Sequence, residues 1–82
     1  MIKLNQIKIG TIVYDWDGHP LRVVVINPKN TWWKVICETI QFGGWLPSQK
    51  MINEYGLSIG KRYWGYSLEE LCLNRCHTYE VE

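Results

Sequence analysis

Three cysteines and one of the two histidines are the first candidates in this chain for binding a metal. Cys37, Cys72, Cys76 and His77 together offer the four sulfur and nitrogen ligands of a tetrahedral zinc site. Structural zinc sites usually present two close ligand pairs, whereas here one C-x3-C-H cluster is accompanied by a single distant cysteine. If a helical turn ends at Cys72, that residue is expected to be a small core side chain instead. We therefore expect neither a bound metal nor another cofactor.

A second candidate is the pair of carboxylates formed by Asp15 and Asp17, next to His19. Paired carboxylates can bind a metal or transfer protons. Asp17-Gly18 is also a strong β-hairpin signal, because glycine readily adopts the positive φ of a tight turn. No second cluster of acids joins the pair, so we interpret the segment as a solvated hairpin tip.

Nucleophilic catalysis by a cysteine needs a histidine base nearby in space. His77 adjoins Cys76 in sequence, but neighbouring residues on a strand point to opposite faces, and His19 would reach Cys37 only through an accident of folding. The sequence contains no glycine-rich phosphate loop, G-x-S-x-G or other recognised catalytic motif. We predict that the protein is not an enzyme.

Aromatic residues are the strongest remaining signal, with five tryptophans and five tyrosines among 82 residues. On strands, Trp32-Trp33 and the run YWGY at 63–66 cannot all point inward, so part of this surface should lie outside the core. Tryptophan, tyrosine and arginine are enriched in binding hot spots. The predicted partner-binding residues are Trp32, Trp45, Arg62, Trp64 and Tyr66. About half of the aromatics should only seal the core, and a register slip of one residue would exchange Trp32 for Trp33.

Size, charge and cysteine usage limit the class of protein. The length predicts a single domain over residues 1–82 with a small core. A formal net charge of +1 argues against a dedicated nucleic-acid binder and against attraction to anionic membranes. The longest apolar run, VVVI at 23–26, cannot span a bilayer, and the N-terminus lacks a signal peptide's apolar region. An odd number of cysteines then fits free thiols, so we expect a cytoplasmic protein with no membrane association.

The first half of the chain reads as three β-strands over residues 11–16, 21–26 and 31–39, separated by turns at 17–18 and 27–30. Alternation predicts which side chains share a face. The predicted sets are Ile12, Tyr14 and Trp16 on the first strand, Leu21, Val23 and Val25 on the second, and on the third Trp33, Val35 and Cys37 opposite Trp32, Lys34 and Ile36.

The segment 41–60 is compatible with two structures. Pro47-Ser48 can begin a short helix that runs through Glu54 and is ended by Gly56, with Met51, Ile52 and Tyr55 on one side. A long β-hairpin through the same residues is the alternative, and we favour the helix.

The last part of the chain predicts a strand, a capped turn and a final strand. Residues 61–66 form the strand, and S-L-E-E at 67–70 is a capping box that begins a helical turn through about Leu73. This turn is expected to bury Leu68, Leu71 and Cys72. Residues 76–81 are predicted to close the sheet as an edge strand, with Tyr79 and Val81 inward.

Two segments, KIGTIVYDWDG at 8–18 and KRYWGYSLEEL at 61–71, carry a resemblance to a known type of fold. Together with the order of elements, they resemble the small SH3-like β-barrel proteins of phages and mobile elements. The resemblance covers about half of the chain. It implies a mainly β (β-rich α+β) fold: an SH3-like barrel of about five antiparallel strands, with a short helical insertion and a capped helical turn before the last strand. The insertion at 41–60 departs from a minimal barrel, and we expect this protein's specificity to lie there.

The function expected from these features is a non-enzymatic protein-interaction module that binds through its exposed aromatic surface. The resemblance implies an inhibitor or adaptor of a host protein, including a bacterial defence protein, and an aromatic strand edge could also support homo-oligomers. Two alternatives remain open. One is nucleic-acid binding through Lys61, Arg62, Tyr63 and Trp64. The other is an oligomeric small-ligand (nucleotide) binder in which tryptophans stack on the ligand and Arg62 or Lys34 meets a phosphate.

Overall fold

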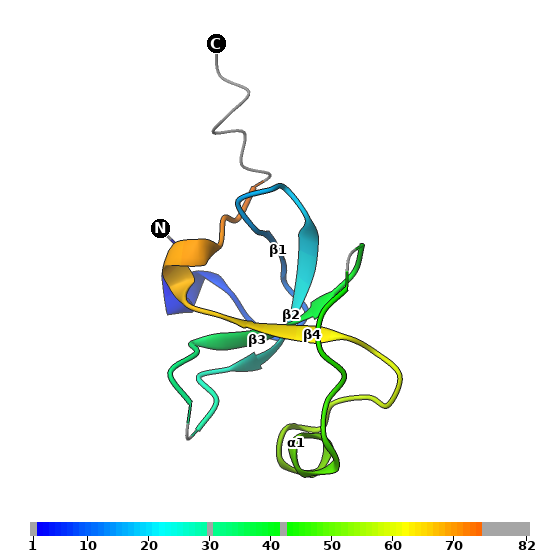
Figure 1. Ribbon diagram of the computed structural model, residues 1–82. Helices are drawn as coiled ribbons and strands as arrows, with labels where there is room; N and C mark the ends of the chain where they lie inside the picture. Colours follow the sequence, from blue (N-terminus) through cyan, green and yellow to red (C-terminus); the bar gives the residue numbers. More distant parts are fainter. Residues whose placement is uncertain (1, 30, 42, 75–82) are drawn as a thin grey trace.

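An antiparallel four-stranded sheet with the strand order β1-β2-β3-β4 organises the chain (Figure 1). The computed structural model describes residues 2–29, 31–41 and 43–74. The strands are β1 (Ile12–Tyr14), β2 (Pro20–Ile26), β3 (Val35–Thr39) and β4 (Tyr63–Tyr66), joined by α1 (Gln49–Tyr55) and by the 3-10 turns η1 (Leu4–Gln6) and η2 (Leu68–Glu70). The predicted β-rich character with one short helix is confirmed. Within the described residues, no helix has the length and apolar character needed to cross a membrane.

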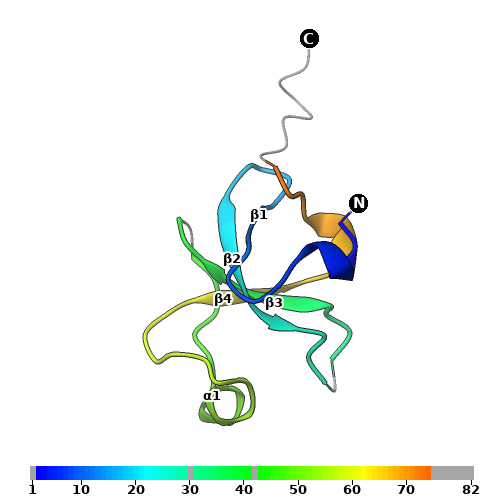
Figure 2. The same cartoon turned by 180° about the vertical axis from the view of Figure 1, so that it is seen from behind.

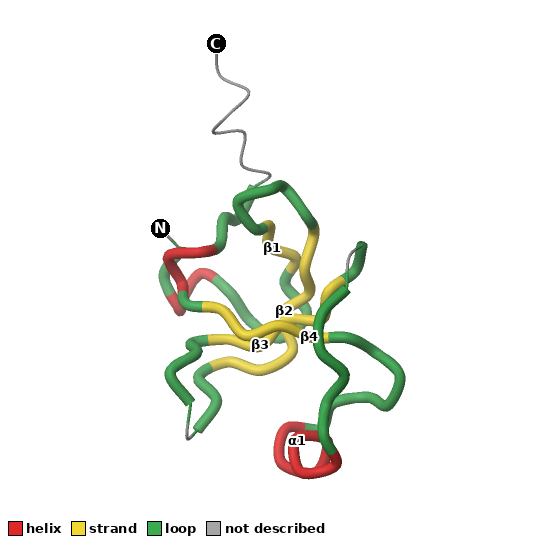
Figure 3. Tube along the Cα trace, viewed as in Figure 1, coloured by secondary structure: helices red, strands yellow, loops and turns green. Residues whose placement is uncertain are grey.

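One face of the sheet carries the main apolar core. Its buried members are Ile2, Ile7, Val13, Leu21, Val23, Val35, Cys37, Tyr66 and Leu71. Leu4 of η1 and Leu68 of η2 pack against this core, and the two turns lie on the same side of the molecule (Figure 3). The ends of the described chain therefore close this face, because the sheet alone would leave its apolar side chains in water.

The other face carries a second, smaller apolar cluster beneath the insertion between β3 and β4. Ile36, Leu57 and Tyr63 are buried there. Met51, Ile52 and Tyr55 of α1 pack against them, as the predicted helical spacing requires, and α1 lies beyond the sheet at one end of the molecule (Figure 2). The insertion therefore gives the second face of the sheet its own cover.

Helix α1 begins and ends where the sequence predicts. The Ser48 side chain accepts a hydrogen bond from the Met51 backbone N–H at 3.2 Å, and Gly56 ends the helix in the left-handed conformation with φ of 72°. The helix, rather than the alternative hairpin, occupies residues 49–55. A single β-bridge between Trp45 and Tyr63 is the only hairpin-like pairing that the insertion makes with β4 in the described residues.

A bulge in β2 changes which face its side chains reach. Val23 lies opposite Cys37, but Val25 lies opposite Ile36, so the register shifts between Val23 and Val25. Leu21 and Val23 are buried in the main core, whereas Val25 packs against the second cluster. The prediction that Val25 shares a face with Leu21 and Val23 is therefore wrong, because strict alternation does not hold across a bulge.

The third strand starts later than predicted, and this moves Trp33. Strand β3 begins at Val35, so Trp32 and Trp33 belong to the preceding loop. Trp33 packs against the second cluster with Ile36, not with Val35 and Cys37 as alternation predicts. Its indole ring lies directly over Gly65 of β4, in the space that a Cβ at that position would occupy. The glycine is what allows a tryptophan to lie flat on the sheet.

The end of the described chain returns to the first strand. The predicted capping box is present: the Ser67 backbone N–H donates to Glu70 Oε1 at 2.8 Å, and the Ser67 side chain faces the Glu70 backbone N–H. The turn η2 ends at Glu70 rather than near Leu73. Leu71 is buried, and the backbones of Cys72 and Tyr14 exchange hydrogen bonds of 2.8 and 2.9 Å. The final strand predicted over 76–81 lies outside the described residues.

Replacing Gly65 with alanine tests the contact with Trp33. We expect Gly65→Ala to lower the free energy of unfolding by about 1–3 kcal/mol, because the added methyl group must displace a ring that is packed against the second cluster. Urea unfolding followed by circular dichroism measures the change. Gly43→Ala is the matched control, because nothing lies within 4 Å of a Cβ there, and it should change stability by less than about 0.5 kcal/mol. Equal stability of the two variants would contradict the packing argument.

Candidate functional site

The residues predicted to bind a partner lie in different environments. Trp32 is 75% exposed and Trp64 is 47% exposed, whereas Tyr66 is only 6% exposed and belongs to the main core. Trp45 is half-buried against the second cluster. Arg62 is exposed, and its Nη1 donates to the Gly44 carbonyl oxygen at 2.7 Å. The two exposed tryptophans are thus the members of this set with large free apolar surface.

Trp32 and Trp64 do not form one continuous surface. Trp64 lies opposite Cys37 in the register of β3 and β4, so its side chain points to the face of the main core. Gly65, the next residue, presents the opposite face, where the Trp33 ring lies. The sheet therefore separates Trp64 from the tryptophans of the β2–β3 loop, and only one of the two surfaces can be central to a small interface.

Four aromatic rings form a row on the second face of the sheet. Trp33 is stacked on Trp45 with ring centroids 5.7 Å apart and planes inclined by 16°. Trp45 contacts Tyr63 at 6.1 Å, and at the other end of the row Trp32 contacts Trp33 at 6.1 Å with an inclination of 54°. Such pairs stabilise by about 0.5–1.5 kcal/mol beyond the area that they bury. Trp33 is held from two sides, by Trp45 and by the β4 backbone, while Trp32 stands at the exposed end.

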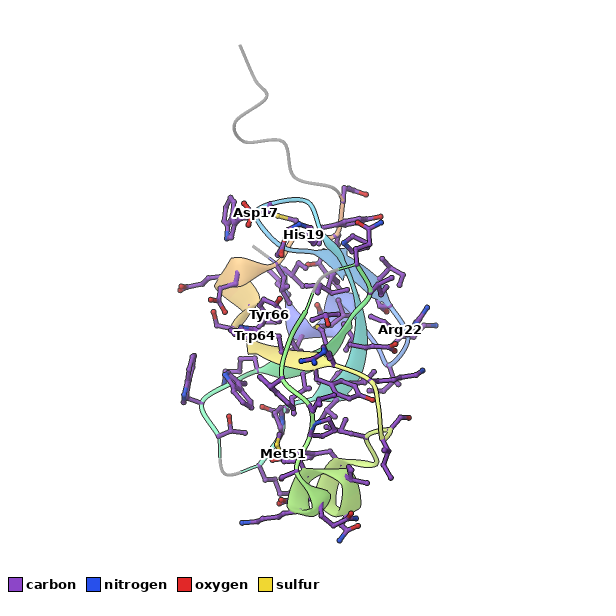
Figure 4. All side chains as sticks on the ribbon, turned by 45° about the vertical axis from the view of Figure 1, so that its right-hand side comes forward. Asp17, His19, Arg22, Met51, Trp64 and Tyr66 are labelled. Atoms are coloured by element: carbon purple, nitrogen blue, oxygen red, sulfur yellow. The ribbon has the colours of Figure 1, made fainter. Side chains whose placement is uncertain are left out.

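Trp32 forms one wall of a pocket between the β2–β3 loop and α1, which we call the Trp32 pocket. Its volume is about 400 Å³. The lining residues are Thr31, Trp32 and Trp33 from the loop and Lys50, Met51, Glu54 and Tyr55 from α1. Figure 4 shows Met51 on α1, at the end of the molecule opposite the β1–β2 hairpin. Three aromatic rings, a thioether and two opposite charges therefore face one small volume.

A second pocket of about 410 Å³ lies on the other side of Tyr55, and we call it the Pro28 pocket. Glu54 and Tyr55 line both pockets, while Pro28 and Lys29 line only this one. The Tyr55 hydroxyl donates a hydrogen bond to the Lys29 carbonyl oxygen at 2.9 Å. This bond ties α1 to the β2–β3 loop and so holds both walls of the Trp32 pocket in place.

Hydrogen bonds within the β1–β2 hairpin explain why Asp15, Asp17 and His19 lie close together. Asp15 Oδ1 accepts from the backbone N–H groups of Asp17 and His19 at 3.0 and 2.9 Å, and Asp15 Oδ2 lies 3.1 Å from His19 Nδ1. The three side chains are the one group of potential metal ligands that lies together in the described part of the chain. Figure 4 places Asp17 and His19 at the hairpin tip, far from Met51. The arrangement is that of a turn whose aspartate satisfies the backbone.

Nothing in the part of the chain that the structure describes brings the predicted zinc ligands together. Cys37 is buried in the main core, Cys72 is partly buried beside β1, and Cys76 and His77 lie outside the described residues. Burial raises the pKa of the Cys37 thiol from 9.0 to about 12, so near neutral pH it stays protonated. Burial, together with the nearby charge of Asp15, also raises the pKa of Tyr66. A protonated, buried thiol is a core side chain and a poor nucleophile.

Several residues of the Trp32 pocket carry no sequence signal for binding. The pattern predicts only a helix for Lys50 and Glu54, and alternation predicts the wrong face for Trp33. The helical spacing of Met51 and Tyr55 predicts that both lie on one side of the helix, which forms one wall of the pocket. The loop across from it lies about twenty residues earlier in the chain, and no local pattern reports such a contact.

Comparison of the chain with models of protein families, with curated proteins and with solved structures found no match.

The raised pKa of Cys37 predicts a loss of stability at alkaline pH. Below pH 9 the thiol is protonated in both the folded and the unfolded chain, but above it the unfolded thiol ionises while the folded one stays protonated up to about 12. At pH 10 this lowers the free energy of unfolding by about 1.4 kcal/mol relative to pH 7. Cys37→Ala lacks this contribution, so urea midpoints measured from pH 7 to pH 10 should fall more for the natural chain. Parallel pH dependence of both proteins would show that Cys37 ionises equally in the two states.

Proposed function

We propose that this protein is a non-enzymatic protein-interaction module that binds its partner through Trp32 and the pocket beside it. The observation that carries the proposal is the position of Trp32: three-quarters of this large side chain is exposed, and it lines a pocket together with Trp33 and Tyr55. Trp33 is fixed by its stack on Trp45, and Tyr55 by its hydrogen bond to the β2–β3 loop. A rigid aromatic surface binds with little loss of side-chain entropy.

Other apolar side chains are also exposed, and they differ from Trp32 in their surroundings. Ile9, Leu46 and Ile59 are at least half exposed, but none of them lines the Trp32 pocket or the Pro28 pocket. Single exposed aliphatic residues are common on protein surfaces and need no function. An exposed tryptophan next to a fixed apolar pocket is the arrangement found at binding hot spots.

We further propose that the sheet closes into an SH3-like barrel. An SH3-like barrel requires the chain after η2 to pair with β1, and the bridge between Cys72 and Tyr14 supports such a closure. Because the sequence resembles small phage proteins of this fold, we propose that the partner is a host protein that the chain inhibits or recruits. The insertion that carries α1 is then the part that adapts a simple fold to one target.

The nucleic-acid alternative receives less support from the structure. Both basic residues that carry it have protein partners: Lys61 Nζ lies 3.6 Å from Glu38 Oε2, and Arg62 donates to the Gly44 carbonyl. A phosphate backbone would have to compete with these contacts, and the net charge of +1 provides little further attraction.

The experiment compares Trp32→Ala with Trp64→Ala in capture from a bacterial lysate, washed at low and at high salt. Bound protein is identified by mass spectrometry, and its binding is then measured by calorimetry with the purified partner. We expect Trp32→Ala to weaken binding by about 30-fold or more, as loss of a hot-spot tryptophan does. Its stability should change by less than about 1 kcal/mol, because so much of the ring is already in water.

Trp64→Ala is the matched control, because it removes the same side chain from the opposite face of the sheet. It should leave partner affinity within about threefold. Loss of binding in Trp64→Ala with retention in Trp32→Ala would move the interface to the other face. Unfolding of Trp32→Ala would show that its ring is structural, and nucleic acid released by salt would support the alternative function.

A further inference from the structure

Three aromatic rings and one carboxylate surround the Trp32 pocket, and this composition suits a particular kind of ligand. A cation near the faces of tryptophan and tyrosine rings is attracted by their electron density, most strongly when it is poorly hydrated. Trp32 and Tyr55 supply the rings, and Met51 adds a polarizable thioether. Trp33, which Trp45 and the β4 backbone hold from two sides, adds an apolar wall. We infer that the Trp32 pocket binds a quaternary ammonium group of the trimethylammonium type. The inference rests on the proposed function, since it names what the aromatic surface recognises.

The geometry of the rings favours a rounded group over a flat one. Trp32 and Trp33 are inclined to each other by 54°, so they form an open angle and not a parallel-sided slot. A nucleobase or another planar ring stacks best between or upon parallel faces. A trimethylammonium group is nearly spherical and can contact rings at several inclinations at once. A volume of about 400 Å³ leaves room for such a head group together with the chain that carries it.

Glu54 supplies the charge that a cation requires. It lines the Trp32 pocket, and it takes part in none of the ion pairs within 4.0 Å that the described residues form. Its negative charge opposes binding of a phosphate-bearing ligand at the same place. Glu54 also lines the Pro28 pocket, so it is the one charged residue that both pockets share.

Lys50 is the opposing charge and gives the inference its sharpest test. It lines the same pocket one helical turn before Glu54, and its ammonium group should repel a cationic ligand. Lysine has a long flexible side chain that can carry its charge out into water while its stem lies along the wall. Lys29 lies beyond Tyr55, in the Pro28 pocket. Removing the two charges on α1 should therefore change affinity in opposite directions.

The test titrates the full chain with choline, with Nε-trimethyllysine in a short peptide and with 3,3-dimethyl-1-butanol, which is the neutral isostere of choline. Binding is followed by the indole N–H signals of the ¹⁵N-labelled protein. We expect both cations to bind at least tenfold more tightly than the neutral isostere. Tighter binding of the peptide identifies a methylated side chain as the source of the group, and tighter binding of choline identifies a small molecule or a lipid head group.

Four variants complete the test. Glu54→Gln should weaken binding of the cations by about two- to tenfold and Lys50→Gln should strengthen it by a similar factor. Trp32→Ala should weaken it by about 5- to 30-fold, and Trp64→Ala should leave it unchanged. Equal binding of choline and its neutral isostere, or changes of the same sign in the two charge variants, would overturn the inference.

The outcome is separable from that of the proposed function. If no cation binds and capture of the protein partner still depends on Trp32, the inference is wrong and the interaction surface stands. If the cations bind but capture of the partner does not depend on Trp32, the ammonium site stands and the proposed interface is wrong.

Discussion

The contact between the Trp33 indole and the backbone of Gly65 is the constraint on which the second half of the structure depends. A sheet of four strands has two faces, and the termini of the described chain cover only one of them. Trp33 begins the cover of the other face, from a loop that precedes β3. It can do so because β4 has a glycine where any other residue would place a side chain. Trp45, which lies within the insertion, then stacks on Trp33, and α1 follows Trp45 along the chain.

This arrangement explains why the insertion is ordered although its helix has only seven residues. A helix of that length is not stable on its own, since most of its backbone groups lie in the end turns. Two capping interactions, at Ser48 and Gly56, provide hydrogen-bond partners for some of these backbone groups. The remainder comes from packing of Met51, Ile52 and Tyr55 on the second cluster, and from the Tyr55 hydroxyl on the β2–β3 loop. The Trp32 pocket is the space left where the loop and the helix meet without closing fully.

How far the sequence predicts this structure depends on the range of the interaction concerned. Local signals were reliable: the caps of α1, the hairpin at Asp17-Gly18 and the interaction between Ser67 and Glu70 each depend on residues within a few positions of one another. The side chains of Val25 and Trp33 were placed on the wrong faces for a different reason. A bulge and a late strand start depend on which packing partners are available across the sheet. The alternation of residues along one strand carries no information about those partners. The candidate pocket combines a loop and a helix that are distant in sequence, so only its helical wall was predictable.

The neighbouring residues Trp32 and Trp33 show why an exposed aromatic here calls for a functional explanation. Only one ring can lie over Gly65, and Trp33 takes that place, because the Thr31 hydroxyl accepts a hydrogen bond from the Trp33 backbone N–H at 3.0 Å and so sets the direction of the loop. The other ring is then left outward, where it contacts Trp33 at one side and is three-quarters exposed. A tryptophan there exposes apolar area that water disfavours, and this cost is recovered only when the ring is covered. The same geometry that packs Trp33 over Gly65 therefore leaves most of the Trp32 ring exposed.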